Sequence, residues 1–194
     1  MTTGFNIVTA NTSSKIDWNS VKNQANLILK QDPDNILYSF RLAIAMANLG
    51  EIEKSYNYIQ GISNRISTQQ FNKEIKPYLE RLGHKENRNN LMLLNYAAFS
   101  ASINNNHKKA KTYFERIVKL DPDNVWMKNY LAATLLELDF YDQAEDILKK
   151  AIKMKSNKYS HLLLGLTYYE QGKYFKALYE FTKSGDLVNR FVFK

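Results

Sequence analysis

The residue types that most often carry catalysis or hold metals are few in this sequence and lie apart from one another. The 194-residue chain has no cysteine and only three histidines. These are His84, His107 and His161. No two of them stand four residues apart, the spacing that holds zinc on a helix, and no glycine-rich phosphate loop or nucleophile elbow is present in the sequence. We therefore expect no catalytic residues, no metal site and no cofactor, and we predict that the protein is not an enzyme.

Charge does not point to a specific anionic partner. The formal net charge is +8, but residues 1–90 carry 11 basic and 8 acidic side chains, and residues 91–194 carry 16 and 11, so the excess is spread along the chain. The clearest clusters are Lys108, Lys109 and Lys111, and then Lys149, Lys150, Lys153, Lys155 and Lys158. Arginine is scarce and aromatic residues are not interleaved with these lysines, as they are in nucleic-acid grooves. We expect weak, salt-sensitive attraction to polyanions and no specific nucleic-acid partner.

Targeting signals are also missing from the sequence as it stands. Residues 1–10 have no basic segment followed by an apolar run, and no stretch reaches 18 apolar residues. We expect a cytoplasmic protein with no transmembrane segment, provided that no targeting segment was removed ahead of Met1.

The elements that position these residues are helices. Seven glycines and three prolines are few for an all-β chain, which needs frequent turn residues. Ala110, Ala144 and Ala177 are spaced by 34 and 33 residues, and each is followed four residues later by a large apolar residue. An apolar segment and then a polar or glycine break precede each of the three alanines. Each period therefore reads as a first helix, a turn and a second helix.

This pattern resembles the tetratricopeptide repeat family. In the last period, the segment Leu164-Gly165-Leu166-Thr167-Tyr168 matches the first block of the family's motif, and Ala177 with Phe181 matches the second. Pro122 stands where the motif ends one period earlier. The resemblance implies an all-α fold, a right-handed superhelical solenoid of helix-turn-helix pairs.

The same register predicts the organisation of the whole chain. Residues 1–35 form an N-terminal segment and a partial repeat whose second helix spans 17–31, with Asp17 as its cap. Residues 67–90 are an inserted helix, started by the capping box that Ser67 and Gln70 can form and kinked or divided at Pro77. Complete repeats span 36–66, 91–124, 125–157 and 158–190, and residues 191–194 are a tail.

In this family the first helices line a concave groove, and the resemblance implies a set of peptide- or protein-binding positions on them. These are Phe40, Ile44, Met92, Asn95, Phe99, Trp126, Asn129, Tyr159, Leu162 and Tyr169. Some of these side chains could instead be packed between repeats. Aromatic rings are typical binding anchors, and Asn95 and Asn129 could hydrogen-bond an extended peptide.

The function that follows is a non-catalytic protein-interaction scaffold or adaptor that binds an apolar helix or an extended peptide in the groove. The alternative is a structural or assembly role in a larger repeat protein or a homo-oligomer, acting through the open ends of the solenoid.

Overall fold

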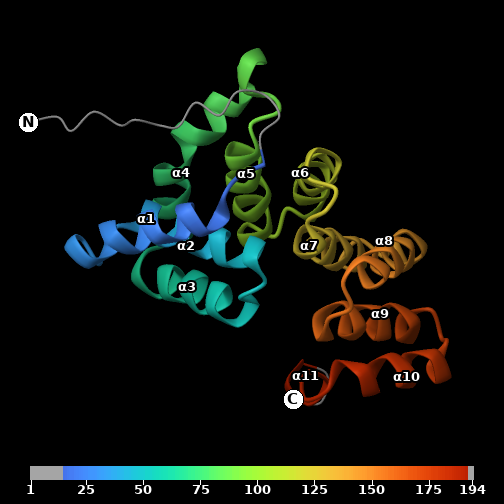
Figure 1. Cartoon of the computed structure of the whole chain (residues 1–194). Helices are drawn as coiled ribbons and strands as arrows, with labels where there is room; N and C mark the ends of the chain where they lie inside the picture. Colours follow the sequence, from blue (N-terminus) through green and yellow to red (C-terminus); the bar gives the residue numbers. More distant parts are fainter. Residues whose placement is uncertain (1–14, 192–194) are drawn as a thin grey trace, which may run out of the picture.

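The computed structural model describes residues 15–191, and all regular structure in that range is helical (Figure 1). The helices are α1 (Trp18–Gln31), α2 (Ile36–Leu49), α3 (Ile52–Arg65), α4 (Thr68–Gly83), a 3-10 turn (Lys85–Asn87), α5 (Leu91–Ile103), α6 (His107–Leu120), α7 (Val125–Leu136), α8 (Tyr141–Met154), α9 (Lys158–Glu170), α10 (Tyr174–Ser184) and α11 (Leu187–Phe191). From α5 to α10 each helix packs against the next one along the chain, as a stacked array. The predicted all-α solenoid of helix pairs is confirmed.

Two kinds of helix alternate in this array. The first helices α2, α5, α7 and α9 are apolar around most of their circumference, and α2 buries every residue from Tyr38 to Asn48 except Arg41. The second helices bury only a stripe at i, i+4 and i+7: Ala110, Phe114 and Ile117 on α6 are all at most 1% exposed. First helices are therefore covered on several sides, while second helices face solvent on one side.

The turn between a first and a second helix has the same backbone geometry in each pair. Gly50, Asn105, Asp139 and Gly172 all have positive φ, between 54° and 82°. The last three are spaced by 34 and 33 residues, which is the period of the sequence. An asparagine caps the first helix of each pair: Asn35, Asn90, Asn124 and Asn157. These asparagine side chains accept hydrogen bonds from free N–H groups of the first helical turn, so the start of each pair is fixed locally.

The first helices begin at Ile36, Leu91, Val125 and Lys158, where the sequence register places the start of each repeat. The division into repeats is itself still a prediction. The predicted N-terminal segment lies outside the described residues up to position 14, as do residues 192–194 of the tail. The short α11, which contacts α9 and α10, was not predicted.

The inserted helix is α4, and its predicted capping box is present: Ser67 accepts from the Gln70 N–H, and the Gln70 side chain accepts from the Ser67 N–H. Pro77 lies inside α4, which runs through it as one helix, so the alternative that Pro77 divides the segment is wrong. Phe71 of α4 meets Phe40 of α2 edge to face at 4.9 Å. Helix α4 thus packs against both α2 and α5 and fills the space that a directly following repeat would take.

Helix α9 and helix α10 approach closely at Gly165. A Cβ added at Gly165 would lie 2.5 Å from the Phe181 ring, whereas one added at Gly61 of α3 would meet nothing within 4 Å.

We predict that Gly165→Ala lowers the free energy of unfolding by about 1 to 3 kcal/mol through overpacking. The control Gly61→Ala should raise it by up to about 1 kcal/mol, because alanine is the better helix former. Urea unfolding of both variants is the measurement, and equal stabilities would contradict this account of the α9–α10 contact.

Candidate interaction site

Six of the ten predicted binding residues lie in the core. Phe40, Ile44, Asn95, Phe99, Asn129 and Leu162 are each at most 5% exposed. Phe99 shows why: its ring packs edge to face against Phe114 at 5.5 Å and against Tyr130 at 4.8 Å. Neighbouring helices cover the first helices at these six positions, so the six side chains pack within the array.

The two amides that were expected to bind a peptide backbone instead join helices. Asn95 of α5 donates to the Leu91 carbonyl at 2.8 Å and accepts from Asn48 of α2 at 2.9 Å. Asn48 in turn accepts from Asn124, the cap of α7, at 3.0 Å. Asn129 of α7 accepts from the Ser160 hydroxyl of α9 at 2.7 Å. Buried amides need such partners, and here they fix how neighbouring repeats sit.

The other four predicted residues, Met92, Trp126, Tyr159 and Tyr169, keep exposed area. Trp126 and Tyr159 meet edge to face at 6.4 Å. The Trp126 ring lies against the turn between α2 and α3, because a Cβ added at Gly50 would overlap it. The Tyr159 hydroxyl donates to Glu53 of α3 at 3.2 Å. These two rings therefore tie the α2–α3 turn to the starts of α7 and α9.

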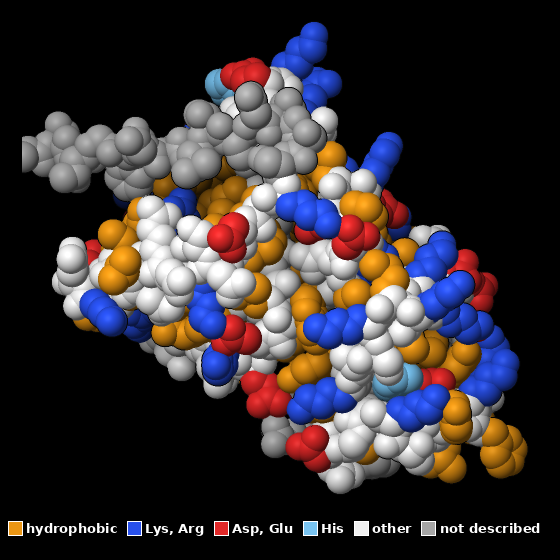
Figure 2. Space-filling model, viewed as in Figure 1, with side chains coloured by type: hydrophobic (Ala, Val, Ile, Leu, Met, Phe, Trp, Pro, Cys, Tyr) orange, Lys and Arg blue, Asp and Glu red, His pale blue; other side chains and the backbone are white. Residues whose placement is uncertain are grey.

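Tyr169 lies at the other end of α9, beside a surface that sequence reasoning missed. Its ring is 5.6 Å from that of Tyr174 on α10. Tyr169 of α9 is 55% exposed, and four large apolar side chains on α10 stand in solvent beside it: Tyr174 is 64% exposed, Phe175 92%, Leu178 64% and Tyr179 59%. We call these five residues the α10 face. Figure 2 shows hydrophobic side chains standing out at the lower right, the corner where α10 lies in Figure 1.

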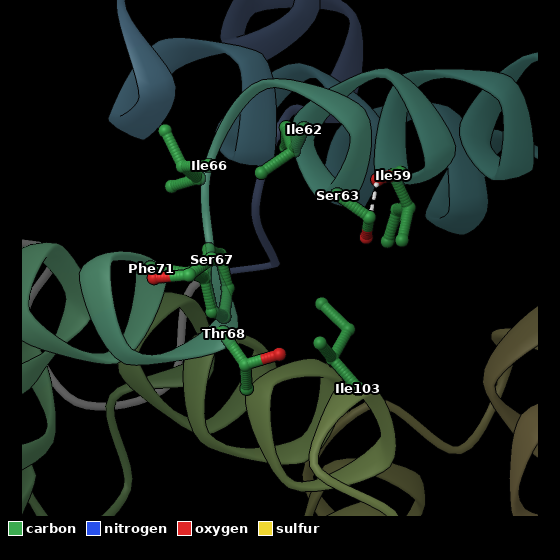
Figure 3. Close-up of a pocket in the computed structure, with 8 residues that line it drawn as sticks. All are labelled: Ile59, Ile62, Ser63, Ile66, Ser67, Thr68, Phe71 and Ile103. Atoms are coloured by element: carbon green, nitrogen blue, oxygen red, sulfur yellow. Dashed lines mark hydrogen bonds between the residues drawn. The ribbon is translucent and has the colours of Figure 1, made fainter.

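A second apolar region is the hollow where α3 leads into α4, with a volume of about 340 Å³ (Figure 3). It is lined by Ile59, Ile62, Ser63, Ile66, Ser67, Thr68, Phe71 and Ile103. The Ser63 hydroxyl donates to the Ile59 carbonyl at 3.2 Å within α3. The hollow arises because the inserted α4 packs on α2 and α5, and not along α3.

A hydrogen-bonded chain that is buried at His161 and Glu180 and reaches the surface at Ser156 holds α10 on α9. His161 Nδ1 lies 2.6 Å from Glu180 Oε2, and His161 Nε2 lies 2.8 Å from Ser156 Oγ. His161 is 6% exposed and Glu180 9%. Hydrogen bonds from a serine to a histidine and from that histidine to a carboxylate also occur in serine hydrolases. In this chain the same three groups link the α8–α9 connection, α9 and α10 at one point.

A second ionic link joins the same helices on the outside. Glu145 of α8 accepts from Lys149 at 2.6 Å and from Lys173, just ahead of α10, at 3.0 Å. Burial alone would raise the pKa of Glu145, but these two hydrogen bonds and charges outweigh it and lower the pKa to about 2.

Within residues 15–191, no cluster of three or more histidine, cysteine or acidic side chains could hold a metal ion. No helix in the same range is both long enough and apolar enough to cross a membrane.

The architecture defines the class as a helical-repeat solenoid with a two-helix period. Residues 103–166, from the end of α5 into α9, match the family model described as tetratricopeptide repeat. Within that segment the chain therefore carries the sequence signature of tetratricopeptide repeats.

Solved structures give the same fold. A MamA mutant is 17% identical with a TM-score of 0.50, over 87% of this chain and 89% of that one. MamA 41-end from Desulfovibrio magneticus RS-1 is 14% identical with a TM-score of 0.50, over 90% of this chain and 88% of that one. At these identities the likeness concerns the fold alone. No curated protein sequence matches the chain.

The lowered pKa of Glu145 predicts an acid-dependent contribution to stability. A carboxylate whose pKa is about 2 in the folded protein and about 4.3 in the unfolded chain stabilises the fold above the higher value, and this contribution is lost as the pH falls towards the lower one. We expect Glu145→Gln to be less stable than the parent by about 1 to 3 kcal/mol at pH 7, with the difference shrinking between about pH 5 and pH 2. Urea unfolding of both proteins across this range is the measurement, and a difference that does not change with pH would rule out the ionic link.

Proposed function

We propose that the protein is a non-catalytic interaction scaffold that holds a segment of another protein on the α10 face. The observation that supports this is the grouping of five large apolar side chains, all at least 55% exposed, on one described surface. Contiguous apolar patches on soluble proteins mark interaction sites. Tyrosine in particular is enriched among the residues that dominate binding energy.

The position of the face in the array supports the same proposal. Within the stack, a helix pair is covered by the next pair: α7 packs on α6, and α9 packs on α8. Helix α10 buries Ala177, Glu180 and Ser184 against α9, and its opposite side carries the exposed aromatic residues. The short α11 contacts α9 and α10 yet leaves all five residues of the face exposed. The face thus has the character of a surface that stacks against another helix.

The predicted concave site is a second candidate, reduced to the members that keep exposed area and lie outside the α10 face: Met92, Trp126 and Tyr159. Cationic side chains border its aromatic rings: Lys155 lies 5.7 Å from the centre of the Trp126 ring, and Lys158 lies 5.4 Å from the centre of the Tyr159 ring. We rank it second because Trp126 and Tyr159 already contact the α2–α3 turn. A partner there would have to compete with these internal contacts.

The α10 face makes a prediction that separates binding from folding. Phe175→Ser combined with Leu178→Ser should abolish partner capture and change the free energy of unfolding by no more than about 0.5 kcal/mol, because both side chains are exposed. Phe114→Ala, in the core, should cost about 3 to 5 kcal/mol. The measurement is quantitative mass spectrometry of proteins retained from source lysate, together with thermal unfolding.

Two control variants locate the effect. Leu27→Ser changes an equally exposed leucine on α1, and its retained proteins should match those of the parent. If the α10 variant retains the same proteins as the parent while Trp126→Ala loses them, the concave site is the correct one.

The proposed absence of catalysis has its own test at Ser156. We expect a fluorophosphonate probe, which labels activated serines, to leave Ser156 unmodified, because the His161–Glu180 pair is occupied in holding α10. The measurement is intact-protein mass after incubation with the probe, with a serine hydrolase as positive control. Labelling that is lost in both Ser156→Ala and His161→Ala would show that the chain is catalytic.

A further inference from the structure

Along one edge of the α10 face, the bordering charged residues of α10 are lysines. At about 100° per residue, Phe175 and Thr182 lie at the middle of the exposed side of α10, with Leu178 and Tyr179 on either side of them. Beyond Tyr179 comes an edge formed by Lys183 and Lys176, and Lys176 Nζ lies 5.6 Å from the centre of the Tyr168 ring of α9. Lys183 Nζ lies 4.1 Å from the centre of the Tyr179 ring, so this basic edge is continuous with the aromatic surface. The acidic residue of α10, Glu180, follows this lysine edge around the helix but is buried against His161 and lies outside the α10 face.

The shape of the face fits a helix better than an extended peptide. Tyr174 with Leu178 and Phe175 with Tyr179 are i, i+4 pairs, which form the ridges that pack between the side chains of a second helix. An extended peptide needs partners for its backbone N–H and C=O groups. The backbone groups of α10 are used within the helix, and the apolar side chains of the face offer none.

We infer that the α10 face binds an amphipathic helix whose apolar stripe is flanked on one side by aspartate or glutamate, lying along the edge of Lys176 and Lys183. The inference rests on the proposed function and adds the chemistry of the partner. Apolar burial supplies most of the affinity, and the acidic residues fix the direction and the register of the partner helix.

A second copy of this chain fits the same face less well. In a symmetric antiparallel pair of α10 helices, the lysine edges of both copies lie on the same side of the interface, so Lys176 and Lys183 would meet their own equivalents. The described surface of α1, at the other end of the array, does not fit either. Its exposed side carries Asn19, Ser20, Asn23 and Gln24 beside the single apolar Leu27.

The test uses three synthetic 18-residue helical peptides that share one Leu/Phe stripe. They carry glutamate, glutamine or lysine along one border of the stripe and are measured by fluorescence anisotropy against the whole chain at low salt. We expect the glutamate peptide to bind about tenfold more tightly than the lysine peptide, with the glutamine peptide between them. Lys176→Glu combined with Lys183→Glu should reverse this order. Lys150→Glu combined with Lys153→Glu, on α8, is the matched control and should leave the order unchanged.

Each outcome decides the inference. Equal affinities for the three peptides, an order that Lys176→Glu/Lys183→Glu leaves unchanged, or no binding of any peptide would overturn it. Tighter binding to vesicles containing phosphatidylserine than to the glutamate peptide would overturn it in favour of a membrane surface. A dimer in sedimentation that is lost in Phe175→Ser/Leu178→Ser would overturn it in favour of a second copy. In all these cases the lysate capture described above still decides the proposed function by itself.

Discussion

The constraint on which the rest of the structure depends is that the first helices are apolar on nearly all sides and must be covered on nearly all sides. Helix α2 shows it most clearly, since α1, α3, α4, α5 and α7 all contact it. Burying so much apolar surface stabilises the stack, at about 25 cal/mol per Å². The same burial removes Phe40 and Ile44 from any groove. The inner surface that repeat proteins often use for binding is, in this chain, largely core.

Apolar stacking does not fix the position of one helix along its neighbour, and hydrogen bonds between buried amides do. Asn48 contacts Asn95 on α5 and Asn124 at the start of α7, so one side chain relates three repeats. Asn129 and Ser160 do the same for α7 and α9. Sliding one helix past another by a turn would leave these amides unpaired, at about 1 to 3 kcal/mol for each buried group. The hydrogen bonds therefore fix the register that burial alone leaves open.

The repeat register of the sequence places helix starts at Ile36, Leu91, Val125 and Lys158, and the structure has a capping asparagine directly before each of them. The sequence could not predict that the side chains of Asn95 and Phe99 are buried between helices. Periodicity tells which residues share a side of a helix, whereas which neighbour covers that side depends on how the stack curves and where α4 packs. The α10 face could have been predicted from the sequence. The other second helices have one apolar stripe, which is buried, whereas α10 carries Tyr174, Phe175, Leu178 and Tyr179 in addition to its buried stripe.

Comparison of second helices shows that the α10 face is more than the outer side of a helix. At the positions that align with Tyr174, Phe175, Leu178 and Tyr179, α6 carries His107, Lys108, Lys111 and Thr112, and α8 carries Tyr141, Asp142, Glu145 and Asp146. Two of these charged side chains form ion pairs within their own helix, Lys111 with Glu115 and Glu145 with Lys149. Helix α10 has aromatic and aliphatic residues there, and its own acidic residue is turned inward to His161. Leaving such a surface in water has a free-energy cost that charged residues would avoid, and the stability of the array does not require it; the proposed partner helix would cover it.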